Sequence, residues 1–211
     1  MTEAQKRKKL ISFLCMVGYF TFGYLAINWF SARRDGFFDL STRFDAAIPF
    51  VPIFIFGYIL VYLSVALACI IDDPDDWRRV VISFFLATSV AYSFFILVPV
   101  RMNLRPVLAG LSGTSAAVTG FFYIIDLPYN CFPSLHVTYP TLVTLAMWRN
   151  HAVMRWVLAA MTAVVAVSVV LVKQHYVADV AAGFLSAALC FWLVVKLEGK
   201  WSKWFISSSE S

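Results

Sequence analysis

The sequence predicts an all-α fold, a polytopic membrane bundle of six helices with a partly helical extracytoplasmic connection. Of the 211 residues, 61% are hydrophobic and only 14% are charged, compared with about 25% charged residues in an ordinary soluble domain. A soluble core cannot hide that much apolar surface. The apolar residues form six continuous stretches, whereas the strands of a membrane barrel would alternate. A soluble globular, disordered or disulfide-rich secreted protein is therefore excluded.

The six stretches approach or exceed the length of about 20 residues that a helix needs to cross the hydrocarbon core. The first has 21 uncharged residues after a basic start, longer than the apolar region of a signal peptide, so we expect a retained span. The second has Pro49 and Pro52 in its first turns, where proline is tolerated. The fourth is short unless its helix begins near Pro133. Residues 1–211 form one transmembrane domain, with expected spans at 10–30, 46–71, 80–100, 133–148, 155–172 and 177–195 and a disordered tail at 205–211.

The connection between the third and fourth spans, residues 101–133, is 33 residues long and unlike the others. Its part 108–125 is apolar enough to resemble a seventh span. It also contains three glycines and four Ser or Thr residues, which make a poor spanning helix. We therefore expect an interfacial or half-inserted helix there.

The distribution of Lys and Arg predicts that both termini face the cytoplasm. Eleven of the 17 basic residues lie on the side of the termini and six on the other side, and basic residues favour the cytoplasmic side. We therefore expect the basic residues behind the net charge of +5 to orient the protein in the membrane or to contact acidic lipid headgroups. Nucleic acid is not an expected partner. The four cysteines show no C-x-x-C spacing, so neither a disulfide frame nor a metal knuckle is indicated.

Two of the three histidines fall at the expected outer ends of spans. His175 and Asp179 are four residues apart at the start of the sixth span, so they share one helix face. An aspartate there is costly unless it is paired, and it would raise the basicity of the far imidazole nitrogen. This pair alone leaves a purely structural role open. His136 begins the fourth span at the same depth, whereas His151 lies in a short cytoplasmic connection and is assigned no role.

Three cations are expected at the same outer level as these histidines: Arg101, Arg105 and Lys173. Each alone would be an ordinary interfacial anchor. Together with two histidines they favour an anion site, and phosphate is the favoured anion because Arg binds it in bidentate fashion. A helix that begins at Ser134 would add backbone N–H donors.

These residues resemble the signatures of the type-2 phosphatidic acid phosphatase superfamily, which are K-x6-R-P, P-S-G-H and S-R-x5-H-x3-D. All three occur in order and on one predicted membrane face. The matching residues are Arg105-Pro106 in the first motif, Pro133-Ser134-Leu135-His136 in the second, and Ser168, His175 and Asp179 in the third.

The sequence departs from these signatures at three positions. Leu135 replaces the usual glycine, and Val98 and Val169 replace the usual lysine and arginine. Arg101 and Lys173 each lie about one helical turn away and could supply the lost charge. The strings around His136 and His175 look more like the branch that includes inositol phosphorylceramide synthases, which move a phospho-headgroup between lipids.

The resemblance implies a double displacement without a metal or other cofactor. His175, oriented by Asp179, would attack phosphorus, and His136 would protonate the leaving oxygen and then act as base. The remaining site residues would bind the phosphate oxygens; they are Arg105, Ser134, Lys173, Arg101 and Ser168.

The favoured function is hydrolysis of a lipid phosphate of the phosphatidate, phosphatidylglycerophosphate or polyprenyl pyrophosphate kind at the outer membrane face. Membrane lipids are therefore the expected partners, and the sequence gives no oligomeric state. A phosphotransferase is the first alternative. A zinc site of His136, His175 and Asp179 is another, disfavoured by the nearby cations. A non-catalytic lipid carrier, channel or scaffold is disfavoured because no charge lies at the midplane of a span.

Overall fold

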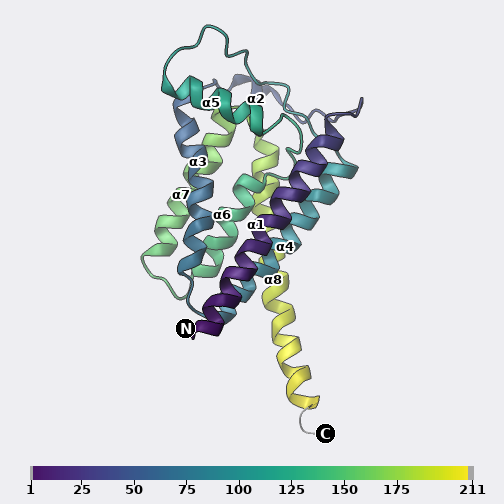
Figure 1. Cartoon of the computed structure of the whole chain (residues 1–211). Coiled ribbons are helices and arrows are strands. Elements are labelled where there is room, and N and C mark those ends of the chain that lie inside the picture. Colours follow the sequence, from purple (N-terminus) through teal and green to yellow (C-terminus); the bar gives the residue numbers. More distant parts are fainter. Residues whose placement is uncertain (1, 209–211) are drawn as a thin grey trace.

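The protein is an all-α polytopic bundle in the computed structural model, which describes the backbone of residues 2–208 and the side chains of residues 2–198 (Figure 1). No strand occurs within these residues. The long helices are α1 (Glu3–Ser31), α3 (Ile55–Leu67), α4 (Pro74–Leu97), α6 (Leu135–Met147), α7 (Met154–Leu171) and α8 (Val177–Ser208). Two shorter helices, α2 (Arg43–Ala47) and α5 (Thr114–Ile125), lie at one end of the bundle.

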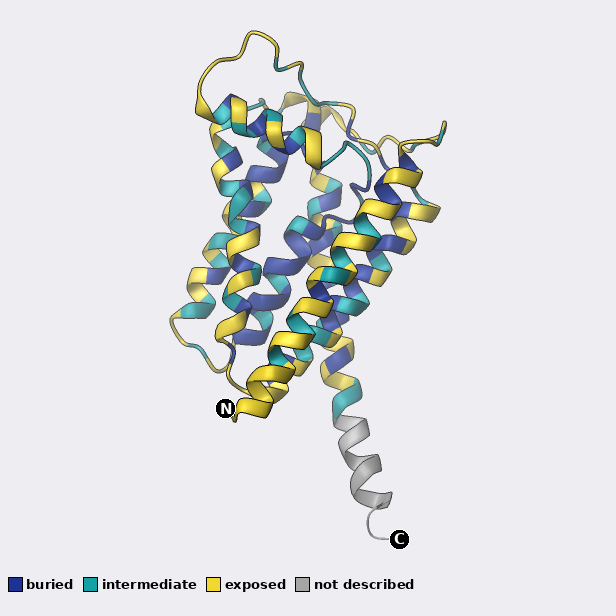
Figure 2. Ribbon diagram, viewed as in Figure 1, coloured by how far each residue is buried: buried dark blue, intermediate teal, exposed yellow. Residues whose placement is uncertain are grey.

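Helix α6 is the centre of the bundle. It contacts α3, α4, α7 and α8, and ten of its thirteen residues are buried. Helix α1 packs chiefly along α4 and exposes most of its surface (Figure 2). The outward faces of the helices are apolar; Phe22 on α1 is 78% exposed and Leu97 on α4 is 74% exposed. An apolar exterior of this kind fits lipid rather than water.

Among the described residues, five helical segments are long and apolar enough to cross a membrane. They are Glu3–Ser31, Pro52–Ile70, Pro74–Leu97, Met154–Leu171 and Val177–Glu198. The expected fourth span corresponds to α6, which has thirteen residues and begins at Leu135, so it falls below a spanning length. Its short length is tolerated because the four neighbouring helices enclose it.

The ends of two spans follow local capping signals that the expected ranges did not use. The helix of the second span begins at Pro52 with a 3-10 turn, so Pro49 lies before the helix rather than in its first turns. Helix α4 begins at Pro74, six residues earlier than expected. There the side chain of Asp73 accepts hydrogen bonds from the backbone N–H groups of Asp75 and Asp76, a typical N-cap.

The connection 101–133 contains α5 and no seventh span. This helix has twelve residues, which is too short to cross a bilayer. It packs against α3 and the 3-10 turn that precedes it and lies across the end of the bundle (Figure 1). The prediction of a helix that does not span is therefore confirmed.

The start of α1 and the end of α8 lie at the opposite end from α5 (Figure 1). At that end Arg79 pairs with Glu198 at 2.7 Å and with Asp76 at 2.7 Å, which ties α4 to α8. Because α1 starts and α8 ends at the same end of the bundle, the chain crosses the bundle an even number of times. The cytoplasmic location of that end stays a prediction. Of the expected tail 205–211, helix α8 includes residues up to Ser208, and residues 209–211 lie outside the described part.

Candidate active site

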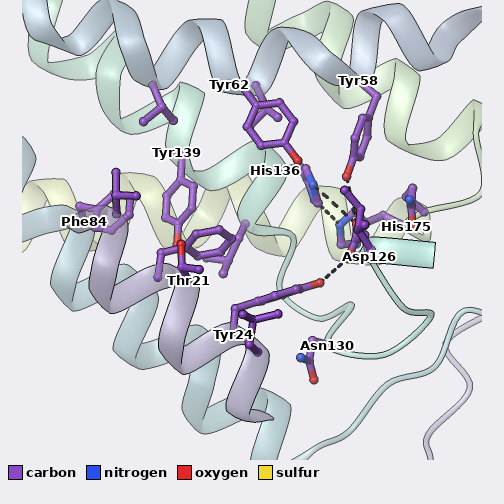
Figure 3. Close-up of a pocket in the computed structure, with 18 of the residues that line it drawn as sticks. Thr21, Tyr24, Tyr58, Tyr62, Phe84, Asp126, Asn130, His136, Tyr139 and His175 are labelled. Atoms are coloured by element: carbon purple, nitrogen blue, oxygen red, sulfur yellow. Dashed lines mark hydrogen bonds and ion pairs between the residues drawn. The ribbon is translucent and has the colours of Figure 1, made fainter. Parts of the chain in front are cut away.

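The structure brings His136, His175 and Asp179 together at the α5 end of the bundle; Figure 3 shows the two histidines. His136 belongs to the first turn of α6, His175 to the loop before α8, and Asp179 to the first turn of α8. The Nδ1 atom of His136 lies 3.1 Å from Nε2 of His175. The Nδ1 atom of His175 lies 3.3 Å from Oδ2 of Asp179. The imidazole from the first turn of α6 therefore meets the imidazole from the loop before α8.

The start of α8 is held against the start of α6 by backbone contacts. The Ser134 N–H donates to the carbonyl oxygen of Asp179 at 3.1 Å, and the Tyr176 N–H donates to the Asp179 carboxylate at 2.9 Å. Gly183 allows this approach, because a Cβ atom there would lie 2.7 Å from the Ser134 carbonyl oxygen. The helix interface thus fixes where both imidazoles lie.

Asp45 anchors the first turn of α8 from the segment before α3. Its carboxylate accepts a hydrogen bond from the Val177 N–H at 2.8 Å and from the Thr42 hydroxyl at 2.5 Å. Burial disfavours its charge, but the hydrogen bonds from Thr42 and Val177 outweigh burial and lower the pKa of Asp45. A buried carboxylate therefore helps to position the His175–Asp179 pair.

A second carboxylate, that of Asp126, lies on the other side of His136. Its Oδ2 atom is 3.8 Å from the His136 Nε2 atom. The hydroxyl of Tyr58 donates to the same oxygen at 3.0 Å, and the hydroxyl of Tyr24 donates to Oδ1 (Figure 3). The sequence analysis did not single out Asp126. The feature that could have identified it is the position of this aspartate directly after the apolar end of α5.

Arg105 is a cation whose charge acts on His136 and whose side chain contacts Gln174, although Arg105 itself does not line the cavity. The guanidinium donates to the Gln174 side-chain oxygen and lies 4.4 Å from the centre of the Tyr123 ring. Arg105 Nε and Gln174 Nε2 are buried without a hydrogen-bond partner among the described residues. Two unused donors next to His175 suit an anion. Sequence reasoning missed Gln174, which is adjacent to His175 in the chain.

Lys173 and Arg101 do not take the places of the missing motif cations. The Lys173 ammonium donates to the carbonyl oxygens of Asp45 at 2.8 Å and Ile48 at 2.6 Å. Burial lowers the pKa of Lys173, which Asp45 opposes. The Arg101 guanidinium lies 5.8 Å from the centre of the Tyr129 ring. Neither side chain lines the cavity that contains both histidines, so the expected compensation is not supported by their placement.

The two motif serines are buried at helix contacts. The Ser168 hydroxyl lies in the contact between α7 and α3, where a Cβ on Gly57 would approach it to 2.2 Å. Ser134 precedes α6, and its described role is the backbone hydrogen bond to Asp179. Both hydroxyls are without a hydrogen-bond partner among the described residues, and neither serine lines the cavity.

A cavity of about 410 Å³ extends from the histidines into the bundle. The polar residues at its histidine end include His136, His175, Asp126 and Gln174. The rest of its wall comes from α1, α3, α4 and α6 and is mainly apolar, including Phe13, Val17, Phe20, Leu25, Val61, Val65, Phe84 and Leu135. A cavity with one polar end and a long apolar wall fits an amphipathic molecule.

The grouping that comes closest to metal-ligand geometry is Cys131, His175 and Asp179, whose ligand atoms lie within 4.8 Å of one another. The proposed zinc set had His136 in place of Cys131. Burial, followed by the nearby Asp179 carboxylate, raises the pKa of the Cys131 thiol, and a protonated thiol is a poor ligand. His175 and Asp179 already contact each other. The donor chemistry therefore does not favour a metal.

Comparison with known proteins gives one match. No curated protein and no solved structure matches the chain. A family model described as the PAP2 superfamily matches residues 25–193, a range that contains both histidines, Asp179 and Arg105. Because this match covers most of the chain and all of the motif positions, the chain belongs to the PAP2 superfamily, the type-2 phosphatidic acid phosphatases and their relatives.

Proposed function

We propose that this protein hydrolyses a lipid phosphate through a phosphohistidine intermediate. The observation that supports the proposal most directly is the chain of contacts from His136 through His175 to Asp179 at the polar end of an apolar cavity. Membership of the PAP2 superfamily and the apolar helices agree with a lipid-phosphatase-like role.

In the first step the Nε2 atom of His175 attacks phosphorus. Asp179 accepts from Nδ1 of the same ring, which leaves the lone pair of Nε2 free and stabilises the positive charge that develops. His136 gives the proton on Nδ1 to the leaving oxygen. A bond from nitrogen to phosphorus forms, the bond from phosphorus to the lipid oxygen breaks, and the lipid leaves as an alcohol.

In the second step His136, now neutral, accepts a proton from water. The water oxygen attacks phosphorus, the bond to His175 Nε2 breaks, and inorganic phosphate leaves. Both rings return to their starting states. Because the two reacting nitrogens are 3.1 Å apart, a phosphoryl group has to replace this contact when it binds.

Arg105 and Gln174 are the groups that would bind the non-bridging oxygens. Their unused N–H donors lie beside His175, and such donors stabilise the charge that moves onto oxygen in the transition state. No metal or cofactor takes part in this scheme. The lipid chain would occupy the apolar part of the cavity between α1 and α3.

A phosphotransferase is the second candidate, and the positions of the cations favour it. In the described part of the chain, Arg105 is the basic side chain that contacts Gln174, the residue before His175, since Lys173 and Arg101 are engaged elsewhere. A phosphodiester monoanion needs less positive charge around it than a monoester dianion. An acceptor lipid hydroxyl would then replace water in the second step.

The test is phosphate release by the purified protein in detergent from phosphatidate, phosphatidylglycerophosphate and polyprenyl pyrophosphate. Wild-type protein is expected to release phosphate from at least one of them. His175→Ala is expected to abolish release, and His136→Ala to lower it by about 10²–10⁴-fold. His151→Ala, in the connection between α6 and α7, is the matched control. Transfer of a headgroup without hydrolysis would overturn the phosphatase, and full activity of His175→Ala would overturn both enzymes.

A further inference from the structure

We propose that Asp126 is a positioning residue for His136, so that two His–Asp pairs face each other across the reaction centre. The inference rests on the proposed function and adds to it a group that the motifs do not contain. Asp126, His136, His175 and Asp179 form one continuous chain of contacts, with distances of 3.8, 3.1 and 3.3 Å. Each imidazole turns one nitrogen to the other ring and its second nitrogen to a carboxylate; Figure 3 shows the two rings and Asp126.

Asp126 is held in place by donors from both walls of the cavity. Tyr24 on α1 and Tyr58 on α3 donate to different oxygens of the carboxylate. Hydrogen bonds to a charged acceptor are among the stronger ones in proteins. The side chains of Asp126 and His136 are only 13% and 17% exposed, so water screens their interaction weakly. The carboxylate of Asp126 is therefore fixed in place and can act electrostatically on the His136 imidazole beside it.

The hydrogen-bonding pattern assigns a proton to the contact between the two rings. If Asp179 accepts from Nδ1 of His175, then Nε2 of His175 is an acceptor. The contact between the rings then requires a proton on Nδ1 of His136. The Nε2 atom of His136 lies 3.8 Å from the Asp126 carboxylate, and a second proton there makes His136 the imidazolium that a general acid needs. Burial opposes that charge, and Asp126 is the group that favours it.

The groups around His136 act on this charge in opposite directions. Burial is the largest influence and disfavours a charge on His136; Asp126 favours the imidazolium, whereas a charged His175 and Arg105 disfavour it. Removing Asp126 therefore leaves His136 among groups that oppose its protonation. The ionisable groups that face His136 are Tyr24 of α1, Tyr58 and Tyr62 of α3, Asp126 and Arg105 of the connection, and His175 of the loop before α8.

The separation of 3.8 Å between Asp126 and His136 fits an ion pair that shortens during the reaction. A phosphoryl group that enters between the rings removes the contact of His136 with His175. The His136 ring then keeps one anionic partner, Asp126, in the described part of the site. Catalytic hydrogen bonds are often long in ligand-free structures and shorten when substrate binds.

The first test compares Asp126→Asn with wild-type protein across the pH range. The variant keeps the shape of the side chain and loses the charge. We expect kcat to fall about 10–100-fold at neutral pH, with KM little changed, and the basic limb of the pH profile to move down by about one unit. Asp126→Glu is expected to keep the basic limb of the wild type. Asp35→Asn, in the exposed loop after α1, is the control.

The second test changes the leaving group. An aryl phosphate with an acidic phenol needs little protonation of its leaving oxygen, so Asp126→Asn should lose much less of its first-step rate with that substrate than with a lipid phosphate. An equal loss for both substrates and at every pH, together with a lower Tm, would mean that Asp126 is only structural and would overturn the proposal.

A third measurement follows the protonation of His136 directly. In protein labelled with ¹⁵N histidine, with signals assigned through His151→Ala and His175→Ala, the second ring nitrogen of His136 should gain its proton at a higher pH in wild type than in Asp126→Asn, because Asp126 favours the imidazolium. The same protonation pH in both proteins would overturn the inference. The proposed function is tested separately: an active His175→Ala removes it, whereas an inactive His175→Ala with a wild-type pH profile for Asp126→Asn removes only the role of Asp126.

Discussion

The carboxylate of Asp45 accepts a hydrogen bond from the backbone N–H of Val177, 132 positions later in the chain, at 2.8 Å. This contact ties the segment before α3 to the first turn of α8, two residues before Asp179. The same segment accepts the Lys173 ammonium through backbone carbonyl oxygens. The placement of the His175–Asp179 pair thus depends on residues that no catalytic motif includes.

Asp45→Asn is expected to destabilise the protein by about 1.5–3 kcal/mol at neutral pH, because hydrogen bonds to a charged group are lost. The pKa of Asp45 is lowered by folding, so its contribution is complete above the unfolded value of about 3.9 and is lost as pH falls through the lower folded value. The variant should therefore lose less stability on acidification than wild type. Thermal unfolding in detergent from pH 7 to pH 3 measures this, and identical pH curves would contradict it.

Gly183→Ala is expected to impair both stability and activity. The new Cβ atom would lie 2.7 Å from the Ser134 carbonyl oxygen, so α8 has to move away from α6 and the imidazoles separate. Gly18→Ala is the matched control, because a Cβ there meets nothing within 4 Å and alanine is the better helix former. The measurement is Tm together with phosphate release, and a Gly183→Ala protein equal to the control would refute the close approach.

Arg105→Lys is expected to weaken phosphate binding, whereas Lys173→Met is expected to lower the stability of the protein. Arg105 has an unused donor beside Gln174, and lysine cannot reproduce a bidentate guanidinium, so inhibition by inorganic phosphate should weaken by about tenfold or more. Lys173 is bound to carbonyl oxygens, so its loss should lower Tm and leave phosphate inhibition nearly unchanged. Inhibition constants and Tm values for both variants decide this, and the opposite ranking would return Lys173 to the phosphate site.

Val65→Trp should discriminate between substrates by chain length. Val65 lines the apolar part of the cavity on α3, so a tryptophan there obstructs a long chain while the histidines keep their places. We expect a higher KM for a long-chain lipid phosphate and an unchanged KM for a short-chain, water-soluble one. Leu63→Trp, at a position on α3 that is 50% exposed, is the control. An equal rise in KM for both substrates would place the lipid chain elsewhere.

Chelation is expected to leave activity unchanged, and so is Cys131→Ser. The reaction proposed above uses Arg105 and Gln174 where other phosphatases use a metal, and burial keeps the Cys131 thiol protonated. The measurement is phosphate release after dialysis against EDTA, with metal analysis of the purified protein. Loss of activity that zinc restores would support the metal site instead.

The fold was predictable because long apolar stretches carry a strong local signal. The convergence of His136 and His175 was also predictable, since His136 lies in the first turn of α6 and His175 two residues before α8, at the same end of the bundle. The hydrogen bonds of Lys173 were not predictable, because the carbonyl oxygens of Asp45 and Ile48 that accept them are more than 120 residues away in the sequence. Asp126 was missed for a similar reason: only the packing of the connection over the bundle brings it to His136. Long-range packing of irregular segments leaves no periodic pattern in a sequence.

The enclosure of α6 also affects how the protein responds to the bilayer. With thirteen residues, α6 is about 20 Å long, less than the thickness of a typical hydrocarbon core. Its four neighbours shield it, so any mismatch with a thicker or thinner membrane is taken up by tilting of the outer helices. We therefore expect the protein, rather than the surrounding lipid composition, to set the depth of the candidate active site in the membrane.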